Sequence, residues 1–186
     1  FCCMKENATL NHIRIFSSAD EAINISSLYT EQAEGSNYEC FQFVNSCVLH
    51  RSDIYGKLNG VNSSCSLSGL TLSKDKQHSA TYINTDHAKP HCKSSQNFKS
   101  ILNDMSSGVF NGRTVVQEDS QKTNSRQSNK NLLLSDKALM NSNPQLEIYA
   151  DDVKCAHGST TGALDKEALF YMQSRGINKE EASSLL

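Results

Sequence analysis

Short runs in which apolar and polar residues alternate recur along this chain, and polar clusters separate them. The runs lie at residues 12–16, 39–44, 67–72, 81–85, 113–117, 131–135 and 146–150. Alternation with a period of two is typical of β-strands that bury one face. The chain is therefore predicted to consist mainly of short strands.

The clusters between the runs predict turns. Four of them, rich in glycine, asparagine and serine, lie at residues 34–37, 59–62, 107–108 and 111–112. Such residues tolerate positive φ or bond to their own backbone. A sandwich, a barrel and a β-helix all fit many short strands with few helices. The asparagine and serine content favours a solenoid, in which polar side chains stack in ladders, although no strict repeat period is present.

The pattern becomes helical near the end of the chain. Asp165 can cap a helix over residues 166–174, and Gly176 suits the left-handed position that follows a helix. Asn178 and Glu181 have the spacing of a capping box for a second helix. The apolar side of the first helix is predicted to consist of Leu169, Tyr171 and Met172.

Composition narrows the classes of partner. A formal net charge of −2 gives no basic excess for nucleic acid. No apolar run approaches the roughly 18–20 residues that a membrane span needs. Seven cysteines without a C-x-x-C pair argue against a zinc ribbon and for free thiols in a reducing compartment.

The length of 186 residues suffices for one domain with a sizeable core. We expect the chain, which begins at Phe1, to be part of a longer one.

Residues 117–130 are almost wholly polar and allow two interpretations. By composition they could form a disordered linker. They could equally form a polar coil of a β-helix, and composition alone does not decide between the two.

Several segments carry a resemblance to a known family. They lie at residues 67–70, 108–112, 121–129, 131–138, 144–148, 150–162, 169–171 and 174–177. In this order and spacing they closely resemble the core signature of the SufB/SufD family of iron–sulfur cluster assembly proteins. The pattern Lys154-Cys155-Ala156-His157-Gly158 is similar to the D-type branch, because B-type members carry His-Glu where this chain has His157-Gly158.

The resemblance implies a fold and a set of partners. The fold would be all-β: a right-handed parallel β-helix over residues 1–163, with its N-terminal coils truncated, and the start of a helical domain over residues 164–186. The function would be that of a scaffold, not an enzyme. It would pair with a B-type (SufB-like) subunit and, through its helical end, with an ABC-type (SufC-like) ATPase subunit. The chain itself has no phosphate-binding G-x-x-x-x-G-K-[ST] loop.

Cys155 and His157 are the candidate site residues. Positions i and i+2 of a strand share a face, and thiolate and imidazole are ligands for iron. The resemblance implies that His157 lies at the interface with the B-type subunit. No permanently bound cofactor is expected. Iron or an iron–sulfur cluster would bind only transiently, at the interface between the subunits. The alternative to a functional site is a purely structural role, in which His157 forms hydrogen bonds and Cys155 packs as a small hydrophobic residue.

Other residues have a structural and a functional interpretation. Phe170, Tyr171 and Arg175 either stabilise the first helix or contact the ATPase subunit. Asp151-Asp152 is interpreted as a turn rather than an acid–base pair. His91-Cys92 is interpreted as structural, because neighbours in a strand point to opposite faces.

Three rival functions remain open from the sequence. They are a carbohydrate-active enzyme on a β-helix, a hydrolase with Cys155 as nucleophile and His157 as base, and the B-type paralogue. We expect a bacterial cytoplasm as the location, with an organelle as the alternative.

Overall fold

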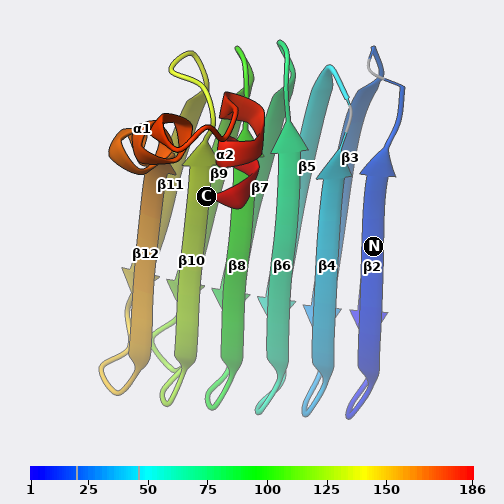
Figure 1. Ribbon diagram of the computed structural model, residues 1–186. Helices are drawn as coiled ribbons and strands as arrows, with labels where there is room; N and C mark the ends of the chain where they lie inside the picture. The colour runs from blue at the N-terminus through cyan, green and yellow to red at the C-terminus, as the bar shows by residue number, and fades with distance from the viewer. Residues whose placement is uncertain (20, 46) are drawn as a thin grey trace.

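The computed structural model describes residues 1–19, 21–45 and 47–186 and shows a β-solenoid followed by two short helices (Figure 1). The strands are β1 (Cys2–Met4), β2 (Thr9–Ser17), β3 (Ile23–Gln32), β4 (Asn37–Asn45), β5 (Leu49–Leu58), β6 (Ser64–Ser73), β7 (His78–His87), β8 (Lys93–Leu102), β9 (Ser107–Val116), β10 (Asn124–Leu133), β11 (Leu139–Ile148) and β12 (Lys154–Ala163). The helices are α1 (Lys166–Ser174) and α2 (Lys179–Leu185).

The strands form two parallel sheets of six, and the chain visits the two sheets in turn. One sheet has the order β1-β3-β5-β7-β9-β11 and the other β12-β10-β8-β6-β4-β2. The coil length varies: Ile23 pairs with Leu49, 26 residues later, whereas Ser107 pairs with Leu139, 32 residues later. Insertions in the turns therefore change the period while the strand register is kept. This explains why the predicted solenoid has no strict sequence repeat.

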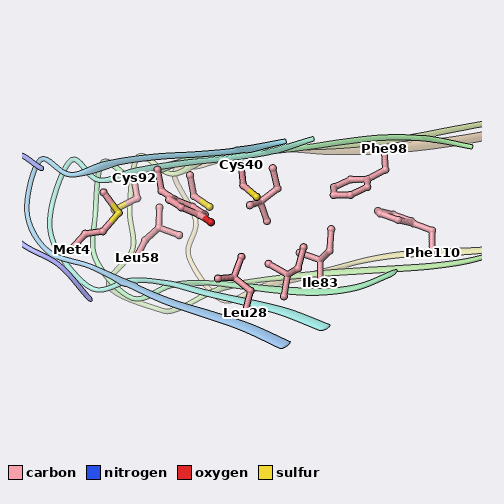
Figure 2. Close-up of a cluster of buried hydrophobic side chains, with 12 residues drawn as sticks. Met4, Leu28, Cys40, Leu58, Ile83, Cys92, Phe98 and Phe110 are labelled. Carbon is pink, nitrogen blue, oxygen red and sulfur yellow. The ribbon is translucent and has the colours of Figure 1, made fainter. Parts of the chain in front are cut away.

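Apolar side chains fill the space between the two sheets in the first coils. The buried cluster extends from Met4 to Phe110 and includes Leu58, which is 0% exposed (Figure 2). The inward-facing Gly69 is part of this packing. A Cβ atom there would lie 2.5 Å from the ring of Phe98, so only glycine leaves room for that ring.

The interior becomes polar toward the last coils. The inward-facing residues of β10 are Ser125, Gln127, Asn129 and Asn131, and all four are buried. The Gln127 side chain donates to Thr114 Oγ1 at 2.8 Å and to the carbonyl of Gly112 at 3.1 Å. Residues 117–130 therefore do not form a linker: their second half is a strand whose buried amides and hydroxyls bond to one another.

The strand predictions were wrong in places where the interior is polar or tightly packed. Residues 107–108 and 111–112 lie inside β9 and are not turns. Packing requires glycine at both positions. A Cβ atom at Gly108 would lie 2.6 Å from Met140 Sδ, and one at Gly112 would lie 2.7 Å from Gln96 Oε1. Strands β1, β3, β5 and β8 were missed. β1 has only three residues, and in the other three strands inward-facing serine, threonine and glutamine hide the alternation. The run at 131–135 ends as a strand at Leu133.

The N-cap residues of both helices are as predicted, and of the capping box in α2 the hydrogen bonds of the described residues include only the half made by Asn178. Asp165 Oδ1 accepts from the backbone N–H groups of Glu167 and Ala168, and Asn178 Oδ1 accepts from that of Glu181 at 2.9 Å. Gly176 has a φ of 87°. The predicted apolar side of α1 is wrong for Tyr171, which is 58% exposed. In the described part of the chain, no helix has the length and apolar character needed to cross a bilayer.

Candidate functional site at the last coil

The last coil leaves one end of the solenoid open. β12 is the last strand of its sheet and pairs only with β10 in the described residues, and β11 likewise pairs only with β9. Each of these two strands therefore has one edge whose backbone N–H and C=O groups are free to pair. In Figure 1 the two strands lie at the same end of the solenoid, beside the helices.

Cys155 and His157 lie on β12 and share one face. They are in register with Ser125 and Gln127 on β10. Both of those residues are buried between the sheets, at 0% and 3% exposure. In-register neighbours of a parallel sheet point the same way, so Cys155 and His157 also face inward. His157 is nevertheless exposed and Cys155 half-buried, because no further coil among the described residues is stacked on the last one.

The environment of Cys155 favours its protonated form. Burial raises the pKa of the Cys155 thiol above its ordinary value, and a backbone hydrogen bond with Ser125 offsets part of that rise. The thiolate, which is the nucleophile, is therefore scarce at neutral pH. This argues against a hydrolase in which Cys155 is activated by His157.

The sequence interpretation missed two polar members of the same face. Ser159 and Thr161 continue the inward-facing positions of β12. Ser159 Oγ donates to Ser142 Oγ of β11 at 2.8 Å, and Asn131 Nδ2 donates to Thr161 Oγ1 at 3.3 Å. The signal was present, because the period-two spacing that joins Cys155 to His157 extends to both residues.

Few side chains at the open end of the solenoid could serve as metal ligands. Within residues 1–19, 21–45 and 47–186, no group of three or more His, Cys, Asp and Glu side chains is placed to hold a metal ion. Cys155 and His157 offer one sulfur and one imidazole. Iron in an Fe–S cluster needs more thiolate or imidazole ligands than this face provides.

Asp151 and Asp152 form a turn, as predicted. Both lie in the exposed bend before β12. The Asp152 carboxylate forms an ion pair with Lys122, and its backbone N–H donates to Gln121 Oε1 at 2.8 Å. One carboxylate is thus engaged in fixing the turn rather than poised for proton transfer.

His91 and Cys92 are kept apart, but not for the predicted reason, because both precede β8 and neither lies in a strand. His91 lies in a turn with a φ of 61° and is exposed. Cys92 is 0% exposed, and its sulfur lies 3.3 Å from Ser63 Oγ. The imidazole and the thiol therefore do not form a site.

Helix α1 presents two aromatic side chains to solvent. Phe170 is 72% exposed and Tyr171 58% exposed. The Arg175 guanidinium donates to the Tyr171 hydroxyl at 2.7 Å and lies 5.0 Å from the centre of its ring. Arg175 thus fixes the position of Tyr171. Phe170 and Tyr171 lie on α1 and Arg175 is its C-cap residue, and the role of the three in partner binding stays a prediction.

Comparison with known proteins identifies a matching family and several relatives. Residues 2–186 match the SufBD core domain of the SUF system for FeS cluster assembly. The iron–sulfur cluster assembly protein SufD of Escherichia coli is 34% identical over 180 residues, which are 97% of this chain and 43% of that protein. SufD of Bacillus subtilis is 40% identical over 86 residues, 46% of this chain and 20% of that protein.

A plant protein is also similar. The chloroplastic protein ABCI7 of Arabidopsis thaliana is 31% identical over 188 residues, which are 98% of this chain and 39% of that protein. The chain thus spans less than half the length of each of these relatives. Because the core-domain match covers nearly every residue and the bacterial relatives include two SufD proteins, the chain belongs to the SufBD family as a SufD-like member.

Proposed function

We propose that this chain is the core of a D-type scaffold subunit that assembles iron–sulfur clusters together with a B-type subunit and an ABC-type ATPase. Its own part would be structural: it presents ligands and docking surfaces and turns over no substrate. Its membership of the SufBD family and its similarity to two SufD proteins support this proposal.

One observation carries the proposal. Cys155 and His157 face the interior of the solenoid at the end where β11 and β12 have open edges. A second parallel strand that pairs with β12 would continue the sheet and cover this face. His157 would then lie between two subunits, at the place where the interface with the B-type partner is expected.

The chemistry at this interface would be that of a shared ligand set. Imidazole nitrogen binds iron in its neutral form, and Cys155 binds iron only after its thiol loses a proton. Two donors on this chain leave room for donors from the partner. The cluster would be a cargo that forms between the subunits and leaves, which fits an open site better than an enclosed one.

We propose that the helical end contacts the ATPase subunit. Phe170 and Tyr171 expose aromatic surface on α1, and Arg175 holds the tyrosine ring in place. Aromatic residues and arginine are enriched at the centres of protein interfaces. The loss of ATPase binding on changing Phe170 and Tyr171 to alanine, with the B-type partner still bound, would support this surface.

The central test changes His157 to asparagine in the complete protein, co-expressed with the B-type and ATPase partners. The complex should assemble in wild-type amounts, and the cluster formed per complex should fall at least about tenfold, since even supporting residues of metal sites contribute 10–100-fold. Cluster content is measured by iron and acid-labile sulfide analysis and by visible absorbance.

His91→Asn is the matched control. His91 is also an exposed histidine, and asparagine tolerates its φ of 61°. This variant should form clusters like the wild type. If His157→Asn keeps the full cluster yield, His157 has no part in the mechanism. If the partners never co-purify, the scaffold assignment itself is wrong.

We place the protein in the cytoplasm of a bacterium. An organelle is the alternative, because the Arabidopsis relative is chloroplastic.

A further inference from the structure

The outer face of one sheet carries cations without counter-charges. The outward-facing side chains of β6, β8, β10 and β12 alternate with the buried ones along each strand and form a continuous surface. We call this surface the basic face. Its cations are Lys93, Lys99, Arg126, Lys130 and Lys154, and all five are exposed.

Carboxylates are missing from the basic face. Its other outward positions hold serine, asparagine, threonine, alanine, glycine, leucine and isoleucine. Glu39, on the neighbouring strand β4 and in register with Ser66, lies outside it. In the described part of the chain, none of the five cations forms an ion pair.

On the other sheet, outward-facing cations have carboxylates as neighbours. Lys57, which forms no ion pair among the described residues, is in register with Glu31 and Asp86. Arg51 pairs with Asp53 at 3.1 Å, and Arg113 pairs with Glu147 at 2.6 Å. The chain as a whole has 18 lysines and arginines against 20 acidic residues. The uncompensated cations therefore reflect where charges are placed and not an overall basic composition.

Like charges also lie close together on the basic face. Lys99 and Lys130 are in register on adjacent strands, whose backbones are about 4.8 Å apart. Like charges directly opposite each other destabilise a sheet. An anionic partner would remove this cost.

The basic face contains a groove of about 240 Å³ between Lys93 and Arg126. Hydroxyl groups line it, among them Ser66 and Ser95, whose Oγ atoms lie 2.9 Å apart. Two cations beside several hydroxyl groups provide charge-assisted and neutral hydrogen bonds for a carboxylate.

We propose that the basic face binds an acidic protein surface, with a carboxylate side chain of that partner in the groove between Lys93 and Arg126. The chemistry favours a protein over nucleic acid, because no outward aromatic residue of the basic face offers a base a stacking platform. The chemistry also favours a protein over a membrane surface, because the basic face consists of strands and contains no amphipathic helix that could insert into lipid. The proposal is independent of His157, which faces the interior.

The test uses fluorescein-labelled poly-L-glutamate and the complete protein at low ionic strength. The wild type should bind the peptide, and added salt should weaken binding. The double variant Lys93→Glu/Arg126→Glu should bind at least about tenfold more weakly, because like charges then face each other across the interface.

The matched control is Lys57→Glu/Lys76→Glu. These lysines are exposed, lie outside the basic face and form no ion pair among the described residues. The control changes net charge by the same amount and should bind within about twofold of the wild type. Should the charge reversal impair folding by circular dichroism, Lys93→Ser/Arg126→Ser gives the milder comparison, because serine is already frequent on this face.

Three results would overturn the proposal. The first is that wild type binds no poly-L-glutamate at low salt. The second is an equal loss of affinity in the control, which would show net charge alone to be responsible. The third is tighter binding to a single-stranded oligonucleotide or to phosphatidylglycerol vesicles than to the peptide, which would assign the basic face to a different class of partner.

Discussion

His157 continues the inward-facing column that Gln127 occupies one coil earlier. The two residues are in register between β12 and β10, but Gln127 is 3% exposed whereas His157 is exposed. The difference arises from the missing neighbour of β12, not from side-chain direction. A strand from a partner subunit would place His157 in the surroundings that Gln127 already has.

This relationship predicts a change in hydrogen exchange on assembly. About half of the β12 amides point toward β10, and the others point to the open edge. The second group, with the corresponding amides of β11, should become protected when the B-type partner binds. Amides of β10, which is paired on both sides, serve as an internal control. Protection confined to α1 and α2 would place the partner elsewhere.

Cys155 should be a slow nucleophile. Because burial raises the pKa of its thiol, alkylation by iodoacetamide at pH 7.5 should be several-fold slower than in the urea-unfolded chain. The rate should keep rising above pH 9. Peptide mass spectrometry measures both rates, and Cys92, which is 0% exposed, should stay unmodified in the folded protein. Equal rates in the folded and unfolded chains would refute the inferred environment.

The polar interior should contribute measurably to stability. Gln127→Ala removes the donor to Thr114 Oγ1 and to the carbonyl of Gly112. Thr114 Oγ1 keeps a second donor, Gln96 Nε2, at 3.3 Å. Losing the two buried hydrogen bonds of Gln127 should lower the free energy of unfolding by about 2 kcal/mol. Gln117→Ala, which loses only an exposed bond to Asp86, should cost under about 0.5 kcal/mol. Urea denaturation measures both values, and similar losses would mean that the network is energetically neutral.

Two buried histidines should make the fold sensitive to acid. Burial lowers the pKa of His50 and of His87 from 6.5 to about 4. Between these values the unfolded chain binds protons that the folded chain excludes. Stability is therefore complete above about pH 7 and falls as the pH drops toward 4, by roughly 3 kcal/mol for each imidazole.

Substitution of one histidine isolates this effect. His87→Gln should lose less stability between pH 7 and pH 4.5 than the wild type, because one of the two titrations is gone. His91→Asn, which removes an exposed imidazole, should follow the wild-type curve. Denaturant titrations at both pH values give the free energies. Parallel pH curves for all three proteins would rule out a role for buried His87.

Sequence patterns predicted the repeating strands, the helix caps and the pairing of Cys155 with His157 on one face. These features are local: side-chain alternation, a capping carboxylate and the two-residue period need no knowledge of distant residues. Where inward-facing residues are polar, as Ser125 and Gln127 are, the same reasoning failed to separate a strand from a linker. The hydrophobic contrast that reveals a buried face is absent there.

The sequence by itself determined that this chain forms many short strands, that two capped helices follow them, and that thiol and imidazole project together from one strand. Only the tertiary structure decided that this strand is the open end of a stack of coils and that five cations gather on one outer face. The physical reason is register. Residues about thirty positions apart become neighbours only when parallel strands align, and turns of unequal length hide that alignment from the sequence.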